Sequence, residues 1–427
     1  MVGFSIRPRV AMRFIADFHL HSKFSRATSK EMEVETLAVW ARKKGISLLG
    51  TGDFTHPTYF AELRSKLEPL GNGLLRLRKG EQGVRYILTT EVSNIYSQGG
   101  KSRRIHTLIF APSFEVAEAI SERLANLGKL SSDGRPIFTF PAKTLVQMIL
   151  EISSDCLLVP AHAWTPWFSI FGANSGFDSM EECFGEMAPH IRAIETGLSS
   201  DPEMNWRLSA LDSITLLSNS DAHSPNRLGR EANVFDCELD YREITEAIRK
   251  KDRRKLLFTI EFFPEEGKYH YDGHRDCRVI FSPSETKANG YLCPVCKKRL
   301  TVGVMHRVEE LADRPEGFIP RNAIPSLHLI PLEEIIAEAL GTKVGTKGVD
   351  LEYERLVERG GSEFRILLDA APEELASFVP PPILEGIIRM RQGKVSIVPG
   401  HDGVYGKISL FPEKKEEGGP EGQLKLF

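Results

Sequence analysis

The sequence predicts an α/β protein in which a domain of alternating strands and helices precedes a small cysteine-rich module and a mostly helical C-terminal region. Three observations lead to this prediction. Seven short apolar runs alternate with helical periodicity in the first 262 residues, cysteines cluster between residues 277 and 296, and turn-separated helical segments fill residues 314–410. We therefore divide the chain into units at 1–262, 263–313 and 314–410, with a charged, Gly- and Pro-rich tail at 411–427.

The composition is that of a globular protein. Hydrophobic residues make up 41% and charged residues 26% of the 427 positions, which argues against a disordered or fibrous chain. No uncharged apolar stretch of about 18 residues occurs, and arginines interrupt the apolar N-terminus, so we expect a cytoplasmic protein with no membrane partner. The formal net charge is −3, so any contact with nucleic acid would need a local basic patch.

Each of the seven apolar runs ends in a polar or metal-ligating residue. The runs are RFIADFHLH, LLGTGDFTH, RYILTTEVSN, IHTLIF, CLLVPAHAW, IRAIETG and ITLLSNSDAH, and helical patterns lie between them at 34–44, 116–127 and 145–152. Strands that alternate with helices are typically parallel, and a (β/α) barrel or an open α/β sheet places its active site at the C-terminal ends of such strands. We therefore expect function at these strand ends.

The first strand end carries His19-Leu20-His21. Side chains alternate along a strand, so both imidazoles face the same side, and Asp17 shares that side. Further candidate ligands at other strand ends are Glu91, His106, His162, Asp221 and His223. Taken singly, each is more often a satisfied core or loop residue than a ligand. Their convergence from separate strands predicts a multinuclear metal site.

The motifs DFHLHS, TGDFTH, TTEVSN, PAHAW and NSDAH resemble, in order and spacing, those of the PHP (polymerase and histidinol phosphatase) superfamily over residues 12–262. The resemblance implies a distorted (β/α)7 barrel that binds two or three metals for phosphoester hydrolysis. It assigns His19, His21, Glu91 and Asp221 to one metal, Glu91, His106 and His162 to a second, and His223 to a third. Many members have Asp-His where this chain has Asp53-Phe54, so Asp53 or His56 is the expected substitute at the third site.

The predicted chemistry follows from these ligands. Imidazole and carboxylate groups suit zinc or manganese, with magnesium as an alternative, and such a centre activates water and clamps phosphodiester oxygens. We assign catalysis to Asp221, His223 and His162 as metal ligands; no protein nucleophile is required, and no Ser-His-Asp signature or P-loop is present. Trp164, Trp167 and Phe168 follow a ligand and could stack on bases; core packing is the alternative for at least one of them.

A second metal site is predicted in the cysteine-rich module. The pairs His274-x2-Cys277 and Cys293-x2-Cys296 are fifteen residues apart, which is the spacing of a zinc ribbon with one histidine in place of a cysteine. His270 or His306 could replace His274 as the fourth ligand, and buried free cysteines are the alternative to a zinc site. The remaining cysteines, Cys156, Cys183 and Cys237, are interpreted as core residues.

Two basic segments are candidates for DNA contact. They comprise Arg249, Lys250, Lys251, Arg253 and Arg254, and the pair Lys297 and Lys298 behind the second cysteine pair. A charge run is most often a solvated helix face. Beside a phosphodiesterase centre and a zinc ribbon, we interpret both segments as contacts to the phosphate backbone.

The order of the PHP-like domain, the cysteine module with CPVCKKRLTVGVMHRVEELADR, and the helical end resembles the endonuclease Q family over nearly the whole chain. This resemblance implies cleavage of DNA on the 5′ side of deaminated bases (uracil, hypoxanthine and xanthine) and of abasic sites, with the damaged nucleotide flipped into a pocket. The alternatives are a PHP phosphomonoesterase of small-molecule metabolism and a non-catalytic DNA-binding adaptor.

The chain ends in Gln423-Leu424-Lys425-Leu426-Phe427. This pentapeptide resembles the QLxLF motif that attaches bacterial enzymes to the sliding clamp (the beta clamp) of DNA polymerase; the PCNA-interacting motif is the more distant match. Leu424, Leu426 and Phe427 would anchor in an apolar groove, and Gln423 would supply an amide hydrogen bond. A terminus that packs on the helical region is the alternative.

Overall fold

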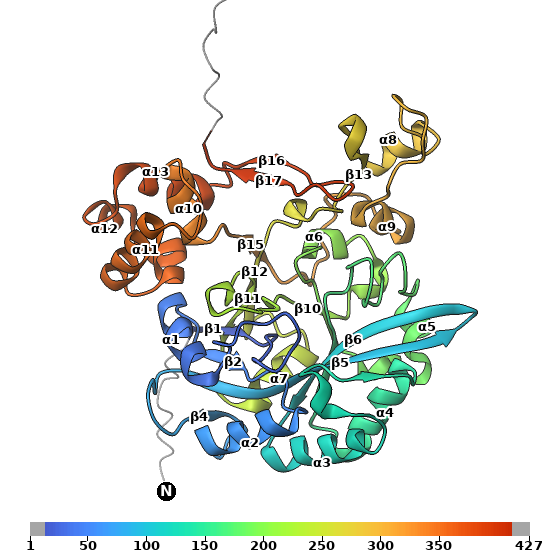
Figure 1. Cartoon of the computed structure of the whole chain (residues 1–427), viewed down its shortest axis with the longest axis vertical. Coiled ribbons are helices and arrows are strands. Elements are labelled where there is room, and N and C mark those ends of the chain that lie inside the picture. The colour runs from blue at the N-terminus through green and yellow to red at the C-terminus, as the bar shows by residue number, and fades with distance from the viewer. Residues whose placement is uncertain (1–12, 412–427) are drawn as a thin grey trace, which may run out of the picture.

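The architecture is seen in a computed structural model, which describes residues 13–411 (Figure 1). In its eleven-stranded sheet, β1 (Arg13–Asp17), β2 (Leu48–Gly50) and β5 (Arg85–Gln98) are neighbouring parallel strands. The other predicted runs form β6 (Lys101–Ala111), β8 (Leu157–Pro160), β9 (Ala193–Glu195) and β10 (Thr215–Leu217). All seven apolar runs therefore contain a strand.

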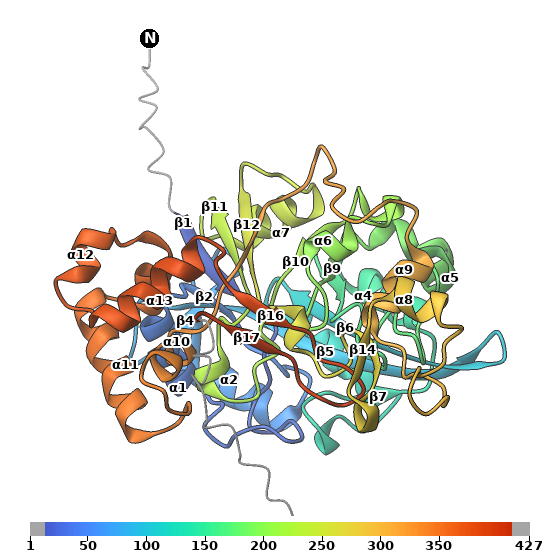
Figure 2. The same cartoon turned by 90° about the horizontal axis from the view of Figure 1, so that it is seen from above.

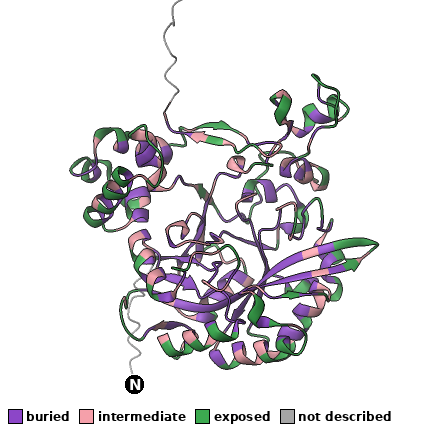
Figure 3. Cartoon of the chain, viewed as in Figure 1, coloured by how far each residue is buried: buried purple, intermediate pink, exposed green. Residues whose placement is uncertain are grey.

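The strand directions differ from the prediction at β6. This strand is antiparallel to both β5 and β8, whereas the β/α alternation predicted parallel strands throughout. The reason is the two-residue loop Gly99-Gly100, whose φ angles are 61° and 72°. Positive φ at both central residues allows a tight type I′ hairpin, so no helical crossover is needed. The hairpin projects from the domain, and its tip is exposed (Figure 3).

The strands close into a ring through β9 and β10. These two strands pair in parallel outside the main sheet. On one side, the backbone N–H of Ala163, just after β8, donates to the carbonyl of Glu195. On the other, the N–H of Ser218 donates to Oδ1 of Asn233 in β11 (Ala232–Asp236), which is antiparallel to β1. The predicted distorted α/β barrel is therefore confirmed.

Helices and short strands cover the ring. They are α1 (Val34–Lys44), α2 (Pro57–Lys66), β3 (Leu67–Pro69), β4 (Leu75–Leu77), α3 (Phe114–Ala125), β7 (Ile137–Phe138), α4 (Ala142–Ile152), α5 (Met180–Phe184), α6 (Pro202–Asn205) and α7 (Tyr241–Arg249). Gly45 ends α1 with a φ of 90°, a left-handed conformation that glycine adopts without steric cost. The apolar faces of these helices pack on the strands and enclose a continuous buried core.

Two strands extend the sheet beyond the ring. β12 (Leu256–Glu261) is antiparallel to β11, and β15 (Ser326–His328) lies parallel to β12. Between them the chain forms the cysteine module, with β13 (Asp272–His274), β14 (Val279–Phe281), α8 (Pro283–Ala288) and α9 (Val304–Leu311). After β15 it forms the helical region of α10 (Leu332–Ala339), α11 (Lys347–Gly360), α12 (Pro372–Ala376) and α13 (Pro381–Arg391).

A C-terminal hairpin connects these two outer parts. β16 (Ser396–Val398) and β17 (Lys407–Ser409) run from the helical region back to the cysteine module, across the top of the barrel as Figures 1 and 2 show. The N–H of Tyr271 donates to the carbonyl of Gly400 at 2.9 Å, and the N–H of Gly406 donates to Glu266 at 3.0 Å. The last residues of the predicted 314–410 unit thus pair with residues of the 263–313 segment.

Within residues 13–411, no helix has the length and apolar character needed to cross a membrane.

Candidate metal centre

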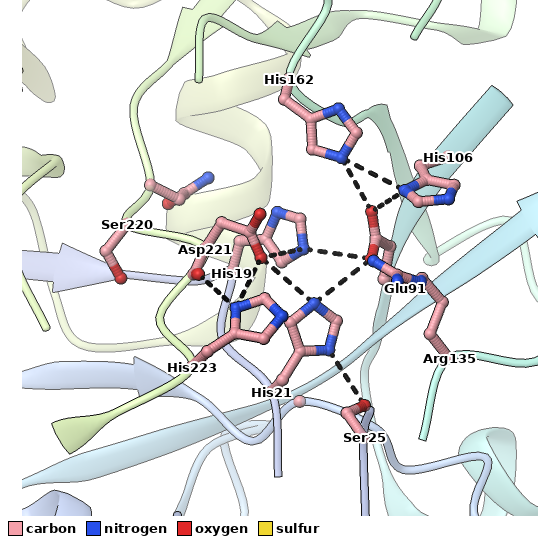
Figure 4. Close-up of polar contacts among 12 residues, drawn as sticks. His19, His21, Ser25, Glu91, His106, Arg135, His162, Ser220, Asp221 and His223 are labelled. Atoms are coloured by element: carbon pink, nitrogen blue, oxygen red, sulfur yellow. Dashed lines mark hydrogen bonds and ion pairs between the residues drawn. The ribbon is translucent and has the colours of Figure 1, made fainter. Parts of the chain in front are cut away.

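Three groups of potential ligands converge at the ends of the barrel strands (Figure 4). In each group the ligand atoms lie within 4.8 Å of one another. The groups are His19, His21 and Glu91; His21, Asp221 and His223; and Glu91, His106 and His162. His21 and Glu91 each belong to two groups, so the three groups form one connected cluster. The strand-end residues predicted from the sequence are therefore neighbours in space.

Glu91 lies at the centre of the cluster and faces histidines on both sides. One carboxylate oxygen, Oε2, is 3.3 Å from Nε2 of His21 and 3.6 Å from Nε2 of His19. The other, Oε1, is 2.8 Å from Nδ1 of His106 and 3.2 Å from Nε2 of His162. A carboxylate with one oxygen in each group is suited to bridge two metals, which is the role that the PHP resemblance implies.

Asp221 and His223 complete the opposite side. Oδ1 of Asp221 is 3.2 Å from Nε2 of His21 and 3.7 Å from both Nε2 of His19 and Nδ1 of His223. His56, which was one expected substitute at this site, instead accepts a hydrogen bond from the N–H of Tyr59 at the start of α2. His223 is thus the histidine that the structure brings to the third group.

Asp53 lies behind the ligands, although the sequence suggested it as one of them. Its Oδ1 is 3.1 Å from Nδ1 of His21. Its Oδ2 accepts hydrogen bonds from the backbone and hydroxyl of Ser22 and from the hydroxyl of Ser25. With both oxygens occupied in this way, Asp53 is placed to orient the His21 ring so that Nε2 faces the cluster. Asp17 also lies outside the three groups and accepts from the N–H groups of Ser220 and Gly229.

Glu195 plays the same part for His19, and sequence reasoning did not single it out. Both oxygens of this fully buried carboxylate are 3.0 Å from Nδ1 of His19. One of them also accepts from the backbone N–H of His162 at 2.8 Å. Glu195 therefore positions ligands from two strand ends. Its signal in the sequence was a carboxylate at the end of the apolar run IRAIETG.

Arg135 is a second residue that the sequence did not indicate. Its Nη1 donates to Oε2 of Glu91 at 3.0 Å. Burial raises the pKa of Glu91, but the contact with the His106 ring and the positive charge of Arg135 outweigh this effect and hold the pKa well below its usual range. Glu91 is therefore ionised, as a metal ligand must be. Burial lowers the pKa of His106 to about 4, which keeps that imidazole neutral and able to coordinate.

Three site residues have strained backbones. The φ angles of Asp53, His162 and Asp221 are 45°, 32° and 47°, in the left-handed region that residues with a Cβ rarely adopt. Such strain persists only where the surrounding structure fixes it, and it concentrates at functional sites. Gly197 has a related role, because a Cβ at this position would lie 2.6 Å from the Cβ of His162. Strand-end loops are thus held in shapes that aim these side chains inward.

The residues fit a metal. Nε2 of His19, Nε2 of His21 and Oδ1 of Asp221 are buried and have no hydrogen-bond partner among the described residues. Buried polar atoms are normally bonded, and here they face one another across 3.2 to 3.7 Å, so a cation that binds all of them accounts for the arrangement. The donors are imidazole nitrogens and carboxylate oxygens, which suit divalent zinc or manganese.

A cavity of about 670 Å³ adjoins the strand-end loops. Pro166, Leu198 and Arg227 line it and follow closely after His162, Glu195 and His223 in the chain. On the far side it is lined by Tyr269 and Tyr405, from the cysteine module and the C-terminal hairpin. The cavity therefore lies between the barrel loops and the two outer parts of the molecule.

The aromatic residues after His162 differ in exposure. Trp164 is a core residue: it is 1% exposed, and its Nε1 donates to Oδ1 of Asn205. Trp167 is 46% exposed, with the guanidinium of Arg104 lying 4.7 Å from its ring centroid. Phe168 contacts the ring of the candidate ligand His106 at 4.7 Å between centroids. Trp167 is therefore the tryptophan of this loop that is free to stack on another molecule.

The cysteine module brings its four predicted ligands together. The ligand atoms of His274, Cys277, Cys293 and Cys296 lie within 4.8 Å of one another. Of the two alternatives to His274, His306 instead contacts Oδ2 of Asp272 at 2.7 Å, and His270 lies outside the group. The N–H of Lys297 donates to the carbonyl of Cys293, which folds the knuckle around the pair. Three thiols and one imidazole are a zinc-type donor set.

The two basic segments are placed differently. Leu256, at the start of β12, pairs with Phe235, which in turn pairs with Phe14 near the start of β1. The run 249–255 directly precedes β12. It therefore lies at one end of the barrel strands, and the candidate metal ligands lie at the other end. Several of its charges have intramolecular partners: Lys250 pairs with Glu246 at 2.6 Å, and Arg254 pairs with Asp252 at 3.2 Å.

The knuckle residues Lys297 and Lys298 are exposed. The clamp-type residues Gln423, Leu424, Leu426 and Phe427 lie outside the described residues. The DNA and clamp contacts at these positions stay predictions.

Sequence relatives cover most of the chain. Protein YqxK of Bacillus subtilis is 32% identical over 411 residues, which are 93% of this chain and 99% of that protein. Protein MJ0043 of Methanocaldococcus jannaschii is 34% identical over 282 residues, or 62% of this chain, and the match spans 34% of the length of that protein. The family model described as the MJ0043 C-terminal domain matches residues 331–394, which contain α10 to α13.

Two solved structures share the whole fold. The lesion-specific endonuclease PfuEndoQ from Pyrococcus furiosus superposes with a TM-score of 0.83 at 34% identity, over 96% of this chain and 98% of that one. Endonuclease Q in complex with a 27-mer duplex substrate that has an abasic lesion at the active site superposes with a TM-score of 0.81 at 35% identity, over 94% and 97%. Because both alignments cover nearly the whole chain, from the barrel to the C-terminal hairpin, the chain belongs to the endonuclease Q family.

Proposed function

We propose that this protein is a metal-dependent DNA repair endonuclease that hydrolyses the phosphodiester on the 5′ side of deaminated bases and abasic sites. The observation that carries the proposal is the connected set of buried ligands around Glu91, next to a large cavity. The relative bound to a duplex with an abasic lesion supports DNA as the substrate, because the two chains align over nearly their whole lengths.

The metals would be held by the residues of the three groups. His19, His21, Glu91 and Asp221 form the first set, Glu91, His106 and His162 the second, and His223 completes the third with His21 and Asp221. When bound, divalent zinc, manganese or magnesium lowers the pKa of coordinated water and neutralises charge on the phosphodiester oxygens.

The protein's own contribution is orientation. Asp53 and Glu195 each fix the ring of one ligand histidine through its Nδ1, so that Nε2 faces the cluster. Arg135 places a permanent positive charge 3.0 Å from Glu91 and keeps that carboxylate ionised at the pH of the cell. These contacts preorganise the ligands, so little reorganisation is needed when substrate arrives.

The cavity is suited to a nucleotide that has left the duplex. Its volume of about 670 Å³ lies within the usual range of roughly 300–1,000 Å³ for small-molecule pockets. Tyr269 and Tyr405 supply aromatic faces, and Arg227 and Arg230 supply positive charge for a phosphate. Trp167, outside the cavity, could stack on the base exposed by the departure of its neighbour.

Two basic segments would contact the DNA backbone outside the active site. The exposed Lys297 and Lys298 lie on the knuckle of the cysteine module, and Arg249, Lys250, Lys251, Arg253 and Arg254 form the second predicted contact. Through DNA the enzyme would be associated with the nucleoid in the cytoplasm, and through Gln423 to Phe427 with the polymerase sliding clamp, for which the bacterial beta clamp is a closer fit than PCNA.

The test is a cleavage assay on matched duplexes. Labelled DNA with a single uracil, hypoxanthine, xanthine or abasic site, and the same duplex undamaged, would be incubated with the full chain and Mn²⁺, Mg²⁺ or Zn²⁺. We expect a nick 5′ of each lesion and none in undamaged DNA. Hydrolysis of p-nitrophenyl phosphate without nicking would instead indicate a phosphomonoesterase, and DNA binding without either activity would indicate an adaptor.

A further inference from the structure

A separate group of metal-type side chains lies between the barrel and β15. Asp201 and Glu203, at the start of α6, and His328, at the end of β15, have ligand atoms within 4.8 Å of one another. Nε2 of His328 is 3.2 Å from Oδ2 of Asp201. The group shares no residue with the strand-end centre or with the cysteine site. Nothing in the proposed nuclease chemistry uses it.

The atoms available in this group are well defined. Oδ1 of Asp201 accepts from the N–H of Met204 and caps the short helix, which leaves Oδ2 directed toward His328. The His328 ring packs against Phe263, with 5.0 Å between the ring centroids, so its orientation is fixed. One imidazole nitrogen and one carboxylate oxygen are thus held in place from two different elements.

A buried carboxylate lies next to the same group. Glu261 is the register partner of His328 in the parallel pair β12–β15, so both side chains project from the same face of the sheet. Glu261 is 0% exposed. Its Oε2 accepts from the hydroxyl of Thr196, but its Oε1 has no hydrogen-bond partner among the described residues. Burial raises the pKa of Glu261 to about 7, and the charge of His328 opposes this effect, so the carboxyl lies within electrostatic reach of the histidine.

The local charge does not balance. Glu265 also lies within the electrostatic influence of Asp201, Glu203 and His328, and its Oε2 is buried without a partner. Four carboxyl groups, those of Asp201, Glu203, Glu261 and Glu265, therefore lie in the neighbourhood of one imidazole, and the first two have an oxygen within 4.8 Å of its ligand nitrogen. The ion-pair partner of Asp201 is the imidazole of His328. Burial raises the pKa of Glu203, Glu261 and Glu265, so without a nearby cation these groups tend to be protonated, whereas a divalent cation would supply two positive charges and keep them ionised.

We propose that Asp201, Glu203 and His328 bind a divalent transition-metal ion, and that the neighbouring carboxylate of Glu261 helps to balance the charge of this ion. The donor set favours Mn²⁺ or Zn²⁺ over Mg²⁺ or Ca²⁺, because an imidazole nitrogen suits the first two and the hard ions prefer all-oxygen sites.

The position of this site indicates its role. β15 is the segment through which the chain passes from the cysteine module to the helical region, and it joins the sheet only at its edge. A metal that ties His328 to Asp201 fastens β15 to the loop after β9, the strand that carries Glu195. The site thus holds the two outer parts at a fixed position relative to the strand-end ligands.

The experiment counts bound Mn²⁺ on the full-length protein. Equilibrium dialysis and elemental analysis would compare the wild type with Glu203→Gln and His328→Gln, and with His190→Gln as a control at an exposed histidine outside every ligand group. Mn²⁺ is the chosen probe because the thiol-rich cysteine site does not favour it. We expect both variants to bind one equivalent fewer than the wild type, or to bind that equivalent at least about tenfold more weakly, and the control to match the wild type.

The outcomes separate this site from the proposed nuclease function, because the ion count does not depend on cleavage. If both variants keep the wild-type count and affinity, Asp201 and His328 form an ordinary ion pair and the proposal fails. If His328→Gln does not fold, Glu203→Gln decides alone, since Glu203 is exposed and its replacement leaves the core intact. An absence of DNA cleavage with the full ion count would refute the nuclease and leave this site standing.

Discussion

The strand-end centre and the cysteine site are built in opposite ways. The ligands of the first come from distant strand ends and are buried in a domain with a large continuous core. Those of the second lie within 23 residues, from His274 to Cys296, and the separate apolar cluster beside them contains only Val279, Cys293 and Leu300 as buried members. In the barrel the packed core holds the ligands in place, whereas the module depends on its bound metal for a stable fold.

This difference means that removal of a ligand should have different effects in the two regions. A barrel domain that keeps its core can lose a ligand and remain folded. A module too small to bury a core depends on its metal for folding energy. Loss of a ligand should therefore lower activity in the barrel and stability in the module, and both quantities must be measured for each variant.

The largest effect is expected for Asp221→Ala and His162→Ala. Each change removes a ligand whose share of catalysis is several kcal/mol, which corresponds to a loss of about a thousandfold or more in cleavage rate. The melting temperature and the affinity for lesion-bearing DNA should change little, because the core and the backbone contacts remain. Single-turnover cleavage, thermal unfolding and fluorescence anisotropy would check this. Wild-type cleavage in either variant would exclude the site.

A smaller loss is expected for Glu195→Gln and Asp53→Asn. Both residues act through a ligand histidine, and loss of such a partner typically costs 10- to 100-fold in metal affinity or activity. Because the ligands themselves remain, added Mn²⁺ should restore much of the rate, which it should not do for Asp221→Ala. A metal titration of the cleavage rate distinguishes the two classes. If Asp53→Asn cannot be rescued, Asp53 is a ligand, as the sequence first suggested.

Replacement of Cys293 and Cys296 by serine should have the opposite effect, a loss of stability with retained cleavage. We expect loss of one zinc per chain, a fall of several degrees in the melting temperature, proteolytic sensitivity within residues 263–313, and a several-fold loss of DNA affinity. Cleavage by the variant at saturating enzyme should persist, because the strand-end centre is intact. Cys156→Ser, at a buried cysteine outside both sites, is the control. An unchanged melting temperature with one zinc fewer would contradict a structural role.

The two basic segments should differ in their effect on binding. Lys297→Glu with Lys298→Glu should lower the slope of log affinity against log salt by about two, since each phosphate contact contributes roughly 0.9. For Arg253→Glu with Arg254→Glu we expect a smaller change in this slope. The run lies at the end of the strands away from the candidate metal ligands, and Arg254 already pairs with Asp252. Equal losses from both pairs would show that DNA wraps around the barrel.

The smallest effect on cleavage is expected from deletion of residues 423–427. The truncated enzyme should nick a short lesion-bearing oligonucleotide at the wild-type rate, because the deletion touches neither metal site. A pull-down with the beta clamp should lose its signal, while the melting temperature stays unchanged. Retained clamp binding, or a lower melting temperature, would contradict the motif assignment and favour packing of the terminus on the helical region.

Sequence reasoning found the strand-end ligands because apolar runs that end in histidine or carboxylate are visible without coordinates. It could not assign Asp53, because a carboxylate near a ligand looks the same whether it faces the metal or the back of His21. Glu195 was missed because the residue that fixes a histidine ring is identified only by its distance from that ring. The predicted direction of β6 was wrong because the prediction rested on the alternation of strands and helices. Two adjacent glycines between strands, here Gly99-Gly100, indicate a hairpin instead.

The return of the C-terminal hairpin to the cysteine module sets an order of events during synthesis. Tyr271 leaves the ribosome 130 residues before His401, the residue whose backbone it pairs with. At about 5–20 residues per second, that interval is roughly 6–26 s. The barrel sequence is complete by then, but the module waits for its last strand partner. All four ligands of the module, from His274 to Cys296, are therefore synthesised well before the strand that later pairs beside them, so the module can take up its metal before its last strand arrives.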